Sequence, residues 1–166
     1  MSAAPAGGVH LHVQVGLQQL DLWDSGTLVR SYPVSTALNG MGEQSGSGCT
    51  PRGLHRVRAK VGVGCDAGTV FVGRRPTGEL YSPELAAQHP GRDWILCRIL
   101  WLTGCEPGVN RGGAVDTLRR YIYLHGCPAG TPLGVPASHG CVRMANADVM
   151  DLFDRVAVGT PVHIVP

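Results

Sequence analysis

The sequence is poor in charged and aromatic residues. Charged side chains make up 16% of its 166 residues and aromatic ones 5%, and the formal net charge is only +2. The basic residues are scattered and form no runs, so we expect no nucleic-acid partner. Glycine and proline contribute 24 and 12 residues, and both interrupt long helices. A coiled coil and a helical bundle are therefore excluded.

Long apolar runs and a recognisable export signal are also missing. The most apolar stretch, 94–102, is interrupted by Arg98 and is shorter than the ~18 residues expected of a membrane span. The first basic residue is Arg30, so the opening stretch lacks the positive segment of a signal peptide. We therefore expect no membrane partner and a cytoplasmic location, or a periplasmic one if a leader has been removed.

Cysteine occurs six times, but no C-x-x-C pair is present. The six are Cys49, Cys65, Cys97, Cys105, Cys127 and Cys141. Cysteines scattered through a cytoplasmic chain normally stay reduced, so no disulfide framework is predicted.

The length suits a single domain spanning residues 1–166. Apolar alternation and turn residues predict strands at 9–15, 17–23, 27–35, 54–61, 69–72, 95–102, 121–124 and 161–165, with a short helical turn at 83–88. One firm helix is expected after Arg143, with Asn146 as its N-cap and Gly159 at its end. Many short strands and one late helix predict a mainly β fold, a sandwich or a barrel.

One tripeptide occurs twice, as His125-Gly126-Cys127 and as His139-Gly140-Cys141. The first copy ends an apolar strand, and the second precedes the expected helix. One interpretation is a cysteine nucleophile with a histidine base, since a nearby imidazolium and a helix N-terminus both lower a thiol pKa. A second is a zinc site made by the two histidines and two cysteines, although H-x-C matches no common zinc spacing. The third is that these groups are inert core residues.

The residues around the second copy distinguish these interpretations. Residues 138–144, SHGCVRM, resemble the active-site motif of the YkuD-type L,D-transpeptidase family. The upstream stretch 122–126, IYLHG, is similar to that family's strand ending in His-Gly, and the stretches PVST at 33–36 and TPRG at 50–53 extend the resemblance. The resemblance implies a β-sandwich of mixed sheets with the C-terminal helix packed beside the active site, and an enzyme with no metal and no cofactor.

The resemblance also assigns roles to individual residues. Cys141 would be the nucleophile and His125 its general base, with the carbonyl of Gly126 orienting the imidazole. His139 and Gly140 would shape the oxyanion site, Ser138 would brace the loop beside the substrate, and Arg143 would bind a substrate carboxylate, which suits its planar fork. Cys127 is not required by the family pattern, and it is either a packing residue or a redox partner of Cys141.

The implied substrates are peptidoglycan stem peptides or muropeptides, cleaved between an L-centre and a D-residue. A cytoplasmic enzyme meets soluble muropeptides, so we expect an L,D-carboxypeptidase that removes terminal D-alanine from tetrapeptides. The alternative is an L,D-transpeptidase that forms 3–3 cross-links or exchanges D-amino acids. A non-catalytic wall-binding or zinc-binding module is a weaker alternative. The sequence predicts neither the acyl acceptor nor the oligomeric state.

Overall fold

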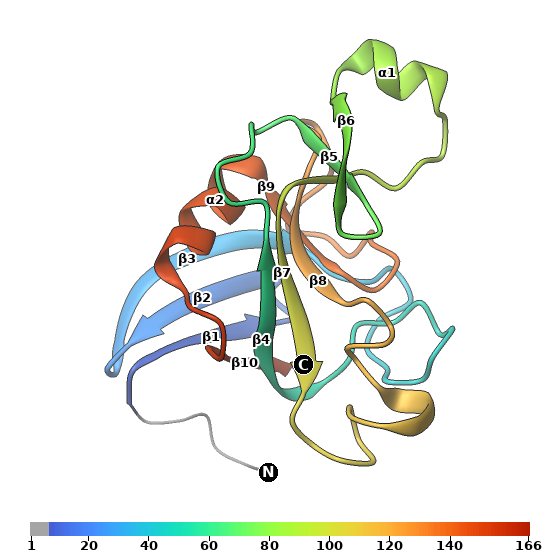
Figure 1. Ribbon diagram of the computed structural model, residues 1–166. Coiled ribbons are helices and arrows are strands. Elements are labelled where there is room, and N and C mark those ends of the chain that lie inside the picture. The colour runs from blue at the N-terminus through green and yellow to red at the C-terminus, as the bar shows by residue number, and fades with distance from the viewer. Residues whose placement is uncertain (1–6) are drawn as a thin grey trace.

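The computed structural model describes residues 7–166, which form ten strands, two α-helices and a short 3-10 helix (Figure 1). The strands are β1 Val9–Gln14, β2 Gln19–Asp24, β3 Thr27–Ser35, β4 Gly53–Val61, β5 Thr69–Val72, β6 Arg75–Leu80, β7 Ile95–Gly104, β8 Tyr123–Cys127, β9 Val142–Ala145 and β10 Pro161–Val165. The helices are α1 Pro83–Gln88 and α2 Asn146–Arg155, and the 3-10 helix is Gly113–Val115.

All ten strands belong to one mixed sheet that closes on itself. Their order is β4-β10-β1-β2-β3-β9-β8-β7-β5-β6, and β4 also pairs with β7. The β1–β10 and β8–β9 pairs are parallel and the other pairs are antiparallel. In Figure 1, β1, β2 and β3 lie behind β4, β7 and β8, and the hairpin β5–β6 extends beyond the closed part. The predicted mainly β sandwich is therefore confirmed, with one continuous sheet forming both layers.

Side chains from both layers form one core. Leu11 and Val13 of β1 are fully buried while the intervening His12 is only half-buried, as the alternation predicts. Helix α2 packs against β7, β8 and β9, and it contributes the buried Val149 and Phe153. Within residues 7–166, no helix combines the length and the apolar character needed to cross a membrane.

The structure corrects the expected start of α2. Asn146 is the first helical residue, and the cap position before it, Ala145, makes no side-chain capping bond. The residues preceding the helix form β9, because Val142 and Met144 are fully buried where this strand lies between β3 and β8. The helix N-terminus is therefore separated from Cys141 by a complete strand.

The end of α2 and the presence of β6 also differ from the prediction. Helix α2 ends at Arg155, with Val156 already extended, so Gly159 lies in the following turn and does not end the helix. Strand β6 was not expected, because most of its residues are exposed and it lacks an apolar alternation. It forms because it pairs with β5 across a tight turn.

We predict that His55 makes the fold sensitive to acid. This buried β4 side chain lies 3.0 Å from the Gly53 carbonyl oxygen through Nδ1 and 3.0 Å from the Thr117 hydroxyl through Nε2. Burial lowers the pKa of His55 to about 4. An unfolded histidine titrates near ~6.5, so the unfolded chain binds this proton first and stability should fall as the pH drops from 6.5 towards 4.

Urea denaturation at pH 7 and pH 4 measures this effect. His55 should account for ~3 kcal/mol of the loss in unfolding free energy between these pH values. The His55→Gln variant should lack that part of the loss, whereas His89→Gln, at an exposed position, should retain it. The same pH dependence in wild type and His55→Gln would contradict the assignment.

Candidate active site

The parallel pairing of β8 with β9 places the two principal candidates on neighbouring strands. His125 of β8 is in register with Arg143 of β9, and Cys141 immediately precedes β9. Both His125 and Cys141 line one cavity of about 470 Å³. The other residues of its lining are Gly73, Arg74, Asp93, Ile95, Tyr121, Tyr123, Ser138, His139 and Arg143. Five of the seven site residues that the sequence predicts therefore line this one cavity.

The Cys141 thiol is held by backbone groups of the segment that leads into β8. Its Sγ accepts a hydrogen bond from the Tyr123 N–H at 3.3 Å and donates one to the Tyr121 carbonyl at 3.3 Å. Burial raises the pKa of Cys141 to about 12, although the Tyr123 N–H partly opposes this shift. The expected thiolate, stabilised by a helix N-terminus, is thus not found, because β9 separates Cys141 from α2. With its pKa raised in this way, the Cys141 thiol is neutral at pH 7.

His125 is buried and has one ring nitrogen fixed by the main chain. Its Nδ1 lies 2.7 Å from the Gly126 carbonyl oxygen, which can only accept a hydrogen bond. Nδ1 therefore carries the proton, and the neutral ring has its lone pair on Nε2, which has no hydrogen-bond partner among residues 7–166. Burial lowers the pKa of His125, while the Gly126 carbonyl and the Asp93 charge act in the opposite direction. The ring is thus a neutral base at pH 7.

Gly126 is required by space as well as by its carbonyl. A Cβ atom built on Gly126 would collide with the Asn146 side chain and with the Leu96 carbonyl oxygen. The carbonyl predicted to orient the imidazole is the one that accepts from Nδ1. The backbone of β8 therefore positions the base directly.

The loop before Cys141 is braced from within. The buried Ser138 hydroxyl donates to the Cys141 carbonyl at 2.5 Å and accepts from the Gly140 N–H at 3.2 Å. The Thr50 hydroxyl donates to the Gly140 carbonyl at 2.9 Å. Ser138 thus lies where the resemblance places a brace. The Gly140 N–H, expected to face an oxyanion, is already bonded to Ser138 in the resting state.

Asp93, which the sequence did not single out, organises the charges of the cavity. Its carboxylate binds the Arg143 guanidinium at 2.9 Å and lies 3.5 Å from Nδ1 of His139. Burial tends to raise the pKa of Asp93, but His125, Arg143 and His139 together hold it below its ordinary value. In the resting state, then, the carboxylate that Arg143 meets belongs to the protein itself. The His139 side chain is 74% exposed.

Arg74 is a second residue that the sequence analysis missed. It lies in the turn between β5 and β6, and its Nη1 donates to the Tyr123 hydroxyl at 3.0 Å. Its guanidinium carbon lies 4.7 Å from the ring centres of both Trp101 and Tyr121. No local motif marks Arg74, because it reaches the cavity only through pairing between distant strands.

The other interpretations of the repeated tripeptide concern zinc ligation and inert packing. The buried Cys127 thiol donates to the Met144 carbonyl at 3.1 Å, and all six cysteines are free. Within the part of the chain that the structure describes, no three His, Cys, Asp or Glu side chains are grouped so that they could hold a metal ion. Cys127 is thus a packed core residue in this structure, and zinc ligation by the four side chains is not supported.

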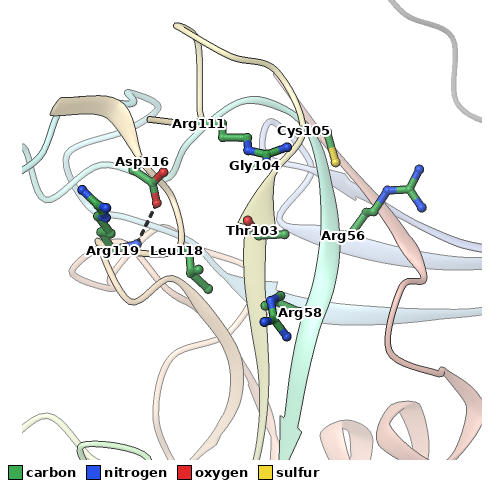
Figure 2. Close-up of a pocket in the computed structure, with 9 residues that line it drawn as sticks. All are labelled: Arg56, Arg58, Thr103, Gly104, Cys105, Arg111, Asp116, Leu118 and Arg119. Atoms are coloured by element: carbon green, nitrogen blue, oxygen red, sulfur yellow. Dashed lines mark hydrogen bonds between the residues drawn. The ribbon is translucent and has the colours of Figure 1, made fainter. Parts of the chain in front are cut away.

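A larger cavity of about 580 Å³ shares none of the residues around Cys141 (Figure 2). Four arginines, one cysteine and one aspartate contribute to its lining, namely Arg56, Arg58, Arg111, Arg119, Cys105 and Asp116. Figure 2 shows the Asp116 carboxylate bonded to the backbone N–H of Arg119, at 3.0 Å. The lining contains no histidine that could act as a base for Cys105. The smaller cavity around Cys141 is therefore the candidate active site.

We predict that the Asp93 charge raises the pKa of His125 and so opposes part of the effect of burial. Because the negative charge favours the imidazolium form, Asp93→Asn should lower the pKa of His125 further below its ordinary value. An NMR titration of ¹³C-labelled histidine, with the His125 signal assigned by substitution, measures the midpoint. Asp154→Asn, at an exposed position on α2, serves as the charge-matched control and should leave the midpoint unchanged. An unchanged or raised midpoint in Asp93→Asn would refute this electrostatic coupling.

Comparison with known proteins gives a consistent result across sequence and fold. The YkuD family, described as the L,D-transpeptidase catalytic domain, matches residues 8–164. A stretch of 46 residues is 44% identical to the probable L,D-transpeptidase YbiS of Escherichia coli strain K12, and it covers 28% of this chain and 15% of that protein. The probable L,D-transpeptidase ErfK/SrfK of Salmonella typhimurium shows the same identity and coverage.

Solved structures share the fold at low sequence identity. L,D-transpeptidase 3 from Mycobacterium tuberculosis, in complex with a faropenem-derived adduct, superposes with a TM-score of 0.59 and 18% identity, covering 96% of this chain and 60% of that one. The L,D-transpeptidase from Xylanimonas cellulosilytica gives 0.57 and 21%, covering 98% and 63%. The chain thus spans less than two thirds of each of these relatives. Since the family match extends over nearly all of its residues, the protein belongs to the YkuD family of L,D-transpeptidase catalytic domains.

Proposed function

We propose that this protein is a cysteine-dependent L,D-carboxypeptidase that cleaves the bond before the terminal D-alanine of peptidoglycan tetrapeptides. The observation that carries the proposal is that a thiol and a neutral imidazole line the same cavity. Cys141 and His125 both line it, and Nε2 of His125 is unbonded among the described residues. Membership of the L,D-transpeptidase family supports the choice of bond.

The first half of the reaction forms an acyl-enzyme. Sγ of Cys141 attacks the carbonyl carbon of the L-centre while the thiol proton moves to Nε2 of His125. A C–S bond forms, and the carbonyl electrons move to oxygen. The tetrahedral intermediate then collapses, the C–N bond breaks, and Nε2–H of His125 protonates the leaving amine of the D-residue. The thioester remains on Cys141 and D-alanine is free.

The second half returns the enzyme to its resting state. Water attacks the thioester carbon and gives a proton to Nε2 of His125. The C–S bond breaks, the tripeptide leaves with a new carboxylate, and the proton passes from His125 to Sγ of Cys141. Because both groups are neutral at rest, His125 acts by proton transfer during bond formation, and such general-base assistance contributes typically ~10²–10⁴-fold.

The space around the nucleophile supports water as the acceptor. Next to the 470 Å³ cavity lies a second one of about 230 Å³, which is also lined by Asp93, His139 and Arg143. Ligand pockets are commonly ~300–1,000 Å³, so the larger cavity suits the donor peptide and the smaller one is short of room for a second stem peptide. Water needs no such pocket.

Transpeptidation is the second candidate, and the shared lining of the two cavities favours it. Asp93, His139 and Arg143 border both cavities, so an acceptor amine that entered the smaller one would approach the acyl-enzyme past these side chains. Holding such an acceptor in line can supply ~7–11 kcal/mol of the barrier. The relatives named as probable L,D-transpeptidases also support this candidate.

We predict a definite ranking of variants in acyl capture. Incubation with faropenem, followed by intact-mass and peptide mass spectrometry, should show one adduct on Cys141. Cys141→Ala should abolish it, while Cys127→Ala, the matched thiol control, should retain it. His125→Ala should slow capture by ~10²–10⁴-fold. His139→Ala should cost less than about tenfold, because an exposed ion pair contributes only ~0–1 kcal/mol. If His139→Ala slowed capture more than His125→Ala, the roles assigned to the two histidines would have to be exchanged.

A separate prediction concerns the products. Incubation of the protein with a disaccharide-tetrapeptide should yield mainly tripeptide and free D-alanine, because the neighbouring cavity of about 230 Å³ is small for an acceptor peptide. Mass spectrometry of the reaction mixture distinguishes these products from 3–3 cross-linked dimers. Dimers that predominate at low substrate concentration would favour the transpeptidase and reject the carboxypeptidase.

A further inference from the structure

We infer that Arg74 forms a subsite for the free carboxylate at the C-terminal end of the substrate peptide. The inference rests on the proposed function insofar as the substrate is a stem peptide, and it is independent of which acceptor resolves the acyl-enzyme. In this role Arg74 replaces Arg143, because the Arg143 guanidinium already binds Asp93 at 2.9 Å and the Ala137 carbonyl at 3.2 Å.

The hairpin turn holds Arg74 in a fixed place over the cavity. Val72 pairs with Arg75, so Gly73 and Arg74 are the two turn residues between β5 and β6. Their φ angles are 56° and 65°, the conformation of a two-residue turn that suits the twist of paired strands. Such a short turn leaves the backbone little freedom. Arg74 therefore projects from a defined point at the tip of the hairpin.

Aromatic side chains fix the guanidinium close to the nucleophile. It lies over the rings of Trp101 and Tyr121, and the Trp101 ring is itself held by a 3.1 Å hydrogen bond from Nε1 to the Leu118 carbonyl. The Tyr123 residue that accepts from Arg74 through its hydroxyl also donates to the Cys141 sulfur through its N–H. One residue thus connects the guanidinium to the reacting thiol.

The charge balance of the cavity leaves Arg74 available. Asp93 is the one carboxylate in the lining, and Arg143 and His139 share it. Among residues 7–166, no carboxylate pairs with Arg74, and the hydrogen bond to Tyr123 uses only one of the five guanidinium N–H donors. A planar guanidinium on an aromatic surface with free donors is suited to a carboxylate, which it can bind through two parallel bonds.

The position of Arg74 identifies which substrate carboxylate it meets. The terminal carboxylate belongs to the D-residue whose amine leaves, so it lies only two bonds beyond the scissile C–N bond. When the scissile carbonyl is at Cys141, this carboxylate remains in the same cavity, which Arg74 also lines. Arg74 would therefore distinguish a free chain end from an interior D-residue.

The test combines two forms of substrate with four forms of the protein. The substrates are the disaccharide-tetrapeptide with a free C-terminal D-alanine and the same molecule with a C-terminal D-alaninamide. The proteins are wild type, Arg74→Gln, Arg74→Gly and Arg75→Gln. Glycine readily adopts a φ near 65°, so Arg74→Gly preserves the turn. Arg75 is the exposed neighbour and controls for the lost positive charge.

We expect amidation of the substrate to lower the kcat/KM of wild type by about 10- to 100-fold, the range for a lost charge-assisted hydrogen bond. Arg74→Gln and Arg74→Gly should lose a similar factor with the acid substrate and lose little more on amidation. Arg75→Gln should behave as wild type. The rate at which uncharged iodoacetamide alkylates Cys141 should be the same in every form of the protein. A structural disturbance around the thiol would change this rate.

Two outcomes would overturn the inference. If amidation lowers kcat/KM equally in wild type and in both Arg74 variants, the carboxylate is bound elsewhere. If wild type processes neither peptide and forms no adduct with faropenem, the proposed function fails and the inference falls with it. The first outcome leaves the proposed function intact, so the two failures are distinguishable.

Discussion

Parallel pairing between β8 and β9 is the constraint on which the candidate site depends. In the observed register His125 lies opposite Arg143, and Val142 and Met144 are buried within the core. A shift of one residue would turn these two apolar side chains towards the cavity and bury Arg143, so the register is strongly specified. The position of Cys141, one residue before β9, follows from it. The burial of Val142 and Met144 thus fixes where Cys141 and His125 lie.

The same arrangement explains why Cys141 and His125, the proposed nucleophile and base, are uncharged at rest. An isolated thiolate and imidazolium placed in the interior would lose much of their solvation, and their attraction would not reliably compensate. The charges of the cavity are concentrated instead on Asp93 and Arg143. In the proposed mechanism, charge therefore separates between Cys141 and His125 only when a substrate carbonyl can accept the electrons. This arrangement limits unproductive thiolate chemistry in the free protein.

The sequence predicted what depends on local patterns and missed what depends on contacts between distant segments. The alternation in β1, the helical turn at α1 and the motif around Cys141 are local, and the structure contains all three. The sequence does not predict strand β9, because its four residues lie directly before a helix signal. Asn146 has the residue type of a cap, but its side chain accepts a hydrogen bond from the Cys97 thiol. Asp93 and Arg74 carry no motif, since only the folded chain brings them to the cavity.

Strand β6 and helix α1 lie at the periphery of the closed sheet, and β5 joins them to it. Within residues 7–166, β6 pairs only with β5, β5 joins the rest through β7, and α1 has no buried residue (Figure 1). Val70 and Phe71 of β5 are buried in the core, but most residues of β6 and all residues of α1 are not, so exchanges in β6 and α1 would leave the closed part of the sheet intact. Natural drift or protein engineering could thus alter the tip that carries Arg74 while the barrel keeps its stability. Under the subsite proposed for Arg74, such a chain can acquire a new substrate preference by changes in this peripheral hairpin alone.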